Sequence, residues 1–215
     1  MLNISNFIAK YVTKRPESMF QADLYAHQSA LNEAIEGKSV LVIGGAGSIG
    51  SSYIKALLPF KPKTLVVVDI SENGLTELTR ELRSTSAFTV PTDYVTYPMN
   101  YADDTFVKMF KDRGGFDIVA NFSAHKHVRS EKDKYSVEAL LKNNVVNAKK
   151  FLDLLCDYPP EHFFCVSTDK AANPVNIMGG SKKIMEDMIM AYAHKFPVTT
   201  ARFANVAFSN GSLPA

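Results

Sequence analysis

Short apolar runs rich in β-branched residues alternate with segments of helical periodicity along most of this chain. These runs predict strands at 39–45, 64–70, 93–100, 116–123, 162–168 and 197–205. The segments between them predict helices at 48–58, 72–84, 102–113, 136–157 and 178–195. The strand runs are nearly continuously apolar, which is typical of parallel strands covered on both faces. The order therefore predicts an α/β fold with a doubly wound parallel sheet of the Rossmann type.

Residues 1–37 precede the first predicted strand and show helical spacing of their apolar side chains. We expect them to form an N-terminal helical extension that packs on the core or on a partner. The predicted domains are this extension and a Rossmann domain over 38–215. The sequence indicates no chemistry for the extension.

Composition and charge limit the classes of protein to which this chain can belong. The chain has 215 residues, of which 46% are hydrophobic, and this suits one domain with a substantial core. The formal net charge is only +2 and no block of Lys or Arg stands out, so nucleic acid is not an expected partner. No segment approaches the ~18 apolar residues that a membrane helix needs, so we expect no membrane insertion.

The two cysteines, Cys156 and Cys165, lie inside apolar runs and lack any Cys/His spacing typical of a metal site. We interpret them as buried free thiols and predict no metal site, which fits a reducing compartment. The N-terminus also lacks the long apolar region of a signal peptide. The expected location is the cytoplasm.

A glycine pattern follows the first predicted strand. Gly44, Gly47 and Gly50 stand in a G-x-x-G-x-x-G arrangement where the strand gives way to a helix. A tight turn, the close approach of backbone N–H groups to a pyrophosphate, and close packing of helix on strand each favour a residue without a Cβ. The helix dipole also favours a phosphate there. Together with Ser48 and Ile49, these glycines predict the phosphate site of a dinucleotide.

The second predicted strand ends in an acidic residue, Asp69. Its distance from the glycines is the ~20 residues at which a carboxylate accepts hydrogen bonds from the adenosine ribose. Such a carboxylate repels a 2′-phosphate, so the expected cofactor is NAD and not NADP. The alternative is a glycine-rich turn followed by an Asp that caps a helix. The order of strand, turn, helix and acid favours the cofactor site.

The G-x-x-G-x-x-G spacing resembles that of the short-chain dehydrogenase/reductase superfamily, and the long chain beyond it resembles the extended branch that acts on nucleotide sugars. In that superfamily the residues after the third strand contact the adenine. The resemblance assigns this contact to Asn100. Alternatively, Asn100 only terminates the strand.

The segment NFSAHKHVRSEKD, residues 121–133, resembles the "HAAAYKHV" segment of the UDP-N-acetylglucosamine 4,6-dehydratases of polysaccharide biosynthesis. It departs from the family pattern at Asn121, Phe122, Ser123 and His125. The resemblance implies that Ser123 and Ala124 line the cofactor and that Lys126 and His127 lie near the sugar nucleotide. The alternative is an ordinary solvated loop. The run that begins at Asn143 and Asn144 resembles a family segment that supports the active-site helix.

The most specific match is STDKAANPVNIMGGSKK, residues 167–183, which resembles the family's "STDKAVNPTNVMGASKR" nearly residue for residue. Thr168 matches the hydroxyl of the superfamily's catalytic triad, and Lys182 matches the lysine that binds the nicotinamide ribose. Met178 stands where the superfamily has a tyrosine, a departure that resembles one branch of these dehydratases. A methionine cannot accept a proton, so another group must deprotonate the sugar's 4-hydroxyl.

The resemblance implies a reaction in three stages. Hydride passes from sugar carbon 4 to NAD, water is eliminated across carbons 5 and 6, and the hydride returns to carbon 6. Asp169 is implied to protonate the leaving 6-hydroxyl, which requires a pKa raised by desolvation. Lys170 is implied to remove the carbon-5 proton, and Thr168 to hydrogen-bond the 4-oxygen. In the family, a Met at position 178 accompanies retention at carbon 5.

Two readings of these catalytic residues remain open. Taken singly, Asp169 and Lys170 are compatible with a surface ion pair and Met178 with a core residue. Taken in this order, they favour an NAD-dependent lyase. The alternatives for the whole chain are a non-catalytic NAD-binding regulatory or scaffold module, or an epimerase or ketoreductase, which normally needs the missing tyrosine.

The last segment, RFANVAFSNGSLPA, resembles the family's "RFGNVxGSxGSV", in which the residue matching Asn205 contacts the sugar nucleotide. A substrate domain follows in the family and is largely absent from this chain, so we expect NAD binding to survive better than turnover. The expected partners are a UDP-sugar and a second copy of the chain. Related enzymes often pair through the long helices, here 136–157 and 178–195.

Overall fold

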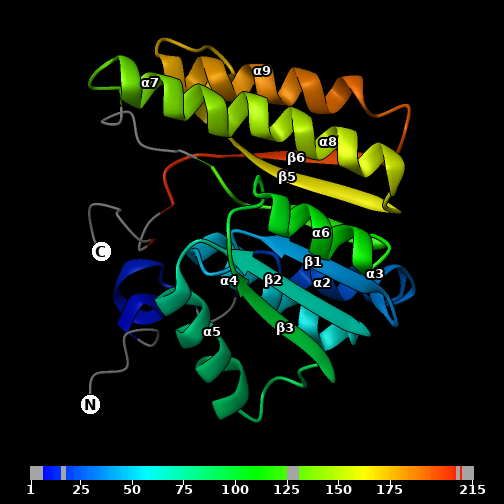
Figure 1. The fold of residues 1–215 in the computed structure, drawn as a ribbon. Helices are drawn as coiled ribbons and strands as arrows, with labels where there is room; N and C mark the ends of the chain where they lie inside the picture. Colours follow the sequence, from blue (N-terminus) through cyan, green and yellow to red (C-terminus); the bar gives the residue numbers. More distant parts are fainter. Residues whose placement is uncertain (1–6, 16–17, 125–130, 207–208, 210–215) are drawn as a thin grey trace.

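The computed structural model describes residues 7–15, 18–124, 131–206 and 209. Among them is a six-stranded parallel sheet in the order β3-β2-β1-β4-β5-β6 (Figure 1). Its strands are β1 (Ser39–Ile43), β2 (Thr64–Asp69), β3 (Asp93–Pro98), β4 (Ile118–Asn121), β5 (His162–Thr168) and β6 (Val198–Phe203). This is the doubly wound Rossmann order. The predicted fold class is therefore confirmed, and each strand end lies within two residues of its prediction.

Helices cover both faces of the sheet. They are α4 (Ser48–Leu57), α5 (Glu72–Ser84), α6 (Asp104–Asp112), α7 (Lys134–Leu141), α8 (Ala148–Asp157) and α9 (Ile177–Ala191), with a short 3-10 turn η2 (Leu58–Phe60) after α4. Alternate strand residues face opposite sides. Val40 and Val42 therefore pack with α4 and α5, whereas Leu41 and Ile43 pack with α6, α8 and α9.

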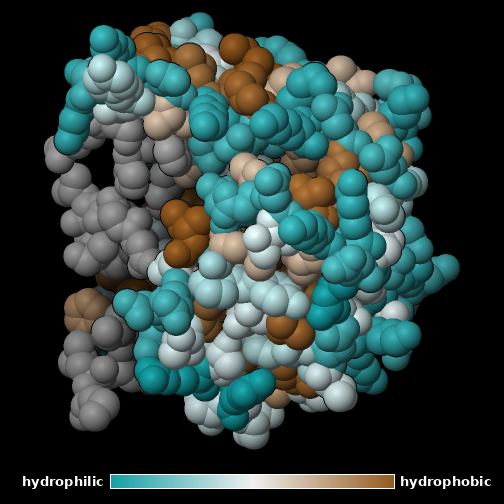
Figure 2. All heavy atoms as spheres, viewed as in Figure 1, coloured by the Kyte–Doolittle hydropathy of each residue, from teal (hydrophilic) through white to brown (hydrophobic). Residues whose placement is uncertain are grey.

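The predicted helix 136–157 is divided by a π-helical segment, η4 (Lys142–Asn147), between α7 and α8. One extra residue per turn rotates the side chains that follow, and such segments occur often at functional sites. In Figure 1 the three segments run continuously beside α9. On the outer side of this layer several apolar side chains are exposed, among them Tyr135, Val146, Ile184 and Met190. Figure 2 shows hydrophobic residues gathered at the upper edge, over α9.

Before the sheet, the described residues form η1 (Ile8–Val12), α2 (Gln21–Ala26) and α3 (Gln28–Ile35). None of the residues in these three segments is buried, although Ile35 packs against the core on the α4 side. In the described part of the chain, no helix is both long and apolar enough to cross a membrane.

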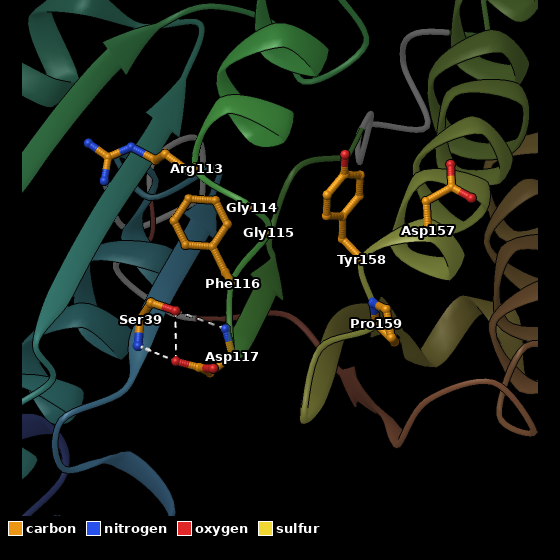
Figure 3. Close-up of a pocket in the computed structure, with 9 residues that line it drawn as sticks. All are labelled: Ser39, Arg113, Gly114, Gly115, Phe116, Asp117, Asp157, Tyr158 and Pro159. Carbon is orange, nitrogen blue, oxygen red and sulfur yellow. Dashed lines mark hydrogen bonds between the residues drawn. The ribbon is translucent and has the colours of Figure 1, made fainter.

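A hollow of about 410 Å³ lies at the amino ends of the strands, away from the edge where cofactors bind (Figure 3). The polar side chains of Ser39, Asp117 and Arg113 that line it have partners within the protein. The Asp117 carboxylate accepts hydrogen bonds from the backbone N and the Oγ of Ser39, both at 2.7 Å. Arg113 forms an ion pair with Asp93 at 3.0 Å. We therefore assign this hollow no role in binding.

Candidate functional site

The glycine turn follows β1 at the carboxyl edge of the sheet. Gly44 has φ +75° and donates its N–H to Val68 O at 2.7 Å. A Cβ on Gly44 would lie 2.8 Å from Ser123 N, and one on Gly50 would lie 2.3 Å from Gly44 O. Both positions therefore require glycine, as predicted.

Gly47 differs from the other two glycines. It is the N-cap of α4, provides no side-chain cap, and has an ordinary φ of −71°. A Cβ there would meet only Gly44 O at 3.4 Å, an ordinary contact. The protein's own packing therefore does not require glycine at this position, although close approach by a ligand would. This open surface at the start of α4, where Ser48 and Ile49 form the first turn, fits a dinucleotide phosphate.

Gly45 was not predicted to matter. A Cβ there would lie 2.3 Å from Val67 Cγ1, so this glycine lets the turn pack on β2. The sequence signal was the doubled glycine after β1.

Asp69 ends β2 and lies against the glycine turn. One carboxylate oxygen accepts from Ala46 N at 3.0 Å and the other from Ser71 N at 2.9 Å. The N-cap of α5 is Ser71, whose Oγ accepts from Gly74 N at 3.1 Å. Asp69 is therefore not the capping residue of that helix, and its half-buried carboxylate stands beside the predicted phosphate site.

The strand-terminating interpretation of Asn100 has direct support. Its Oδ1 accepts from Ala102 N at 3.0 Å, and its N–H donates to Asp103 Oδ2 at 3.3 Å. The side chain thus closes a local turn after β3. The contact with adenine stays a prediction.

Ser123 and Ala124 follow β4, and Ser123 lies close to the glycine turn, since its backbone N is the nearest atom to a Cβ on Gly44. Ser123 N also donates to Asn121 Oδ1 at 2.9 Å. Asn121 is buried, and its role in holding this loop was not predicted. The predicted substrate residues Lys126 and His127 lie outside the described residues.

Four predicted site residues meet after β5. Thr168 Oγ1 donates to Asp169 Oδ1 at 2.9 Å, and Lys170 Nζ lies 3.3 Å from the same oxygen. Lys170 Nζ also donates to Asn205 Oδ1 at 3.5 Å. Asp169 and Lys170 belong to a short 3-10 turn, η5 (Asp169–Ala171). A hydroxyl, a carboxylate, an amine and an amide are thus in contact at the carboxyl edge of the sheet.

The exposure and the pKa of Asp169 differ from the prediction. Its side chain is 51% exposed, and the hydrogen bonds from Thr168 and Lys170 lower the pKa of its carboxyl below the usual range. The expectation of a desolvated, protonated Asp169 is therefore wrong for the protein without substrate. Lys170 is 38% exposed, and this carboxylate is its ion-pair partner.

Met178 and Lys182 lie on the buried side of α9, with exposed fractions of 2% and 3%. Lys182 Nζ donates to Val166 O at 3.1 Å, and burial lowers the pKa of its ammonium group. In this structure the ammonium is held under β5 and is not presented at the edge. Its contact with the nicotinamide ribose stays a prediction.

The π segment η4 supports α9. Asn144 Nδ2 donates to Ser181 Oγ at 3.0 Å, and Ser181 Oγ donates to Met178 O at 2.7 Å. This agrees with the supporting role implied for Asn143 and Asn144. An unpredicted ion pair joins α9 to β6, since Arg202 Nη2 lies 2.6 Å from the buried carboxylate of Glu186. The 186–202 spacing carries no motif, so only the fold reveals this pair.

Both cysteines are free, as predicted; Cys165 is buried and Cys156 partly so. Among the described residues, no three His, Cys, Asp or Glu side chains gather in a way that could hold a metal ion.

Comparison with known proteins decides the family. A family model described as "Polysaccharide biosynthesis protein" matches residues 40–214. The chain belongs to this family. It is 37% identical over 181 residues to "Uncharacterized membrane protein MJ1061" of Methanocaldococcus jannaschii, covering 82% of this chain and 51% of that protein.

The chain is also similar to a named enzyme and to a protein of solved structure. A "UDP-N-acetylglucosamine 4,6-dehydratase (inverting)" of Campylobacter jejuni is 28% identical over 191 residues, covering 82% of this chain and 51% of the enzyme. The solved structure of Pen from Bacillus thuringiensis superposes with a TM-score of 0.72 at 26% identity, covering 83% of this chain and 53% of Pen. The chain thus spans about half the length of these relatives.

Proposed function

We propose that this chain is the cofactor-binding part of an NAD-dependent 4,6-dehydratase that converts UDP-N-acetylglucosamine to a UDP-4-keto-6-deoxy-N-acetylhexosamine. The observation that carries the proposal is the contact of Thr168, Asp169, Lys170 and Asn205 at the carboxyl edge of the sheet. Membership of the polysaccharide biosynthesis family and the likeness to the Campylobacter jejuni dehydratase support the substrate and the reaction.

NAD fits the first half of the site. The open surface at Gly47 suits a pyrophosphate, and the Asp69 carboxylate suits ribose hydroxyls while repelling a 2′-phosphate. When bound, NAD would accept the hydride from sugar carbon 4 and later return it to carbon 6.

The residues after β5 suit the elimination. We assign Thr168 to hydrogen-bond the sugar 4-oxygen, whose proton passes to solvent as the hydride leaves carbon 4, and Asp169 to protonate the leaving 6-hydroxyl. We assign Lys170 to accept the carbon-5 proton and to return a proton to carbon 5 when hydride adds to carbon 6. Without substrate, the Thr168 hydroxyl donates to Asp169 and holds its pKa low. If the sugar 4-oxygen accepts the hydrogen bond of the Thr168 hydroxyl, Asp169 loses the hydrogen bond that lowers its pKa. The sugar ring also shields the carboxylate from water. Both changes raise the pKa of Asp169 toward the value that an acid catalyst needs.

Two alternatives fit less well. A non-catalytic module needs only the glycine turn and Asp69, and gives no reason for the contacts around Asp169. A 4-epimerase or ketoreductase normally relies on the tyrosine replaced by Met178. We also propose a homo-oligomer formed through the exposed apolar side chains of α7 and α9, and a reducing, cytoplasmic setting that suits the free cysteines.

The test is incubation of the protein, at its full natural length, with NAD and UDP-N-acetylglucosamine, followed by mass spectrometry and NMR. A product that has lost one water supports the dehydratase. A product of unchanged mass with an inverted carbon 4 would instead establish an epimerase. Bound NAD with no change in any UDP-hexosamine would favour the non-catalytic module.

A further inference from the structure

Glu131 makes an unpredicted contact with the first turn of α9. Its Oε1 accepts a hydrogen bond from Met178 N at 2.6 Å, across 47 positions of the chain. The next acidic residue, Asp133, accepts from Ser136 N at 2.8 Å and caps α7. The chain from Glu131 to Asp133 is thus joined to the starts of two helices.

The first N–H groups of a helix have no partner within the helix, and a carboxylate at that end is favourable. Two side chains meet this need in α9. Asn176 Oδ1 accepts from Gly179 N at 2.7 Å, and Glu131 accepts from Met178 N. Asn176 is the residue directly before α9 and acts locally. Glu131 instead joins α9 to a distant segment, the one that follows Lys126 and His127 in the sequence.

We infer that Glu131 is a positioning residue, which ties the chain from Glu131 to Asp133, at the start of α7, to the helix turn where Met178 replaces the tyrosine. This inference rests on the proposed function. Because Met178 offers no hydroxyl to a sugar, the placement of the substrate depends on neighbouring segments. Glu131 does not react. Its hydrogen bond holds the backbone at the start of α9 next to residues 131–133.

The test compares Glu131→Ala, Glu131→Gln and Asn176→Ala in the full-length protein. Glu131→Ala is expected to raise the KM for UDP-N-acetylglucosamine about tenfold, the loss of one charge-assisted hydrogen bond, with a smaller change in kcat and unchanged affinity for NAD. Glu131→Gln keeps an acceptor oxygen and is expected to restore most of the KM. Asn176→Ala removes a cap from the same helix turn but leaves the hydrogen bond between Glu131 and Met178 N. The melting temperature of this variant should fall about as much as that of Glu131→Ala, without the same rise in KM.

Amide hydrogen exchange gives a second measurement that does not depend on turnover. Glu131→Ala is expected to speed exchange both at 131–137 and at 177–181, whereas Asn176→Ala speeds it only at 177–181. Equal effects of the two alanine variants on KM, or no change at 131–137, would overturn the inference. If the wild-type protein dehydrates no sugar nucleotide, the proposed function fails, and the exchange pattern still decides whether Glu131 links the two segments.

Discussion

The glycine turn and the loop after β5 lie at the same edge of the sheet, but the contacts within the protein fix the turn more firmly than the loop. In the turn, Gly44 and Gly50 are fixed by backbone atoms less than 3 Å from where a Cβ would stand, and Asp69 is already bonded to Ala46. In the loop, Asp169 and Lys170 are about half and two-fifths exposed, and the Asp169 carboxylate accepts hydrogen bonds from Thr168 and Lys170.

This difference has a functional meaning. Under the proposed function, the turn suits a dinucleotide as it stands, whereas the Asp169 carboxyl, whose pKa is lowered, must be protonated before it can act as the acid. A substrate that displaces water and takes the Thr168 hydrogen bond would cause that change.

Lys170→Ala should lower the rate of dehydration by ~10³-fold, because it removes the base for the carbon-5 proton. NAD affinity should not change, since Lys170 contacts Asp169 and Asn205 and not the glycine turn. Steady-state kinetics and calorimetric titration with NAD measure the two effects. Lys149→Ala removes an exposed lysine on α8 and is the control. A rate within tenfold of wild type would rule out Lys170 as the base.

Gly50→Ala and Gly47→Ala separate packing from cofactor binding. The Cβ added by Gly50→Ala would clash with Gly44 O, and we expect a loss of about 3 kcal/mol in the free energy of unfolding. At Gly47 the added Cβ makes an ordinary contact, so stability should fall by about 1 kcal/mol at most while NAD affinity drops. Urea unfolding and NAD titration test both. Equal destabilisation by the two substitutions would contradict the distinction.

Asp69→Asn should reduce the preference for NAD over NADP by about tenfold, because it removes the negative charge that repels a 2′-phosphate. The amide keeps one of the two acceptor oxygens, for Ala46 N or for Ser71 N, so the melting temperature should fall less than in Asp69→Ala. Asp69→Ala removes both functions and should also lower stability by about 1 kcal/mol. Unchanged cofactor preference in both variants would show that Asp69 does not bind the ribose.

Asp169 should take up part of a proton when UDP-N-acetylglucosamine binds at neutral pH. Its pKa is lowered in the free protein, so the carboxyl is ionised there, whereas the proposed acid is protonated in the complex. Calorimetry in two buffers of different ionisation enthalpy measures this uptake. Asp169→Asn should abolish it. No uptake in the wild-type protein would mean that Asp169 does not become the acid when substrate binds.

Sequence reasoning predicted the fold well because local signals were consistent. The continuous apolar runs indicated the parallel strands, and the glycine pattern with Asp69 indicated the turn beside β1 and β2. It also named Thr168, Asp169, Lys170 and Asn205, which the fold brings together.

The remaining features depend on distances that a linear sequence does not contain. The exposure of Asp169 and the burial of Lys182 follow from how η5 and α9 pack on β5. The bond from Met178 N to Glu131 joins residues 47 positions apart. The π segment η4 was not predicted, since the apolar periodicity indicated a single helix over 136–157.

The most direct test of the central claim is the reaction in deuterated water, with NAD and UDP-N-acetylglucosamine, followed by NMR of the product. The account predicts a 4-keto-6-deoxy sugar that carries deuterium at carbon 5, and Met178 predicts retained configuration there. An unlabelled carbon 5, or a product that keeps its 6-hydroxyl, would contradict a 4,6-dehydratase.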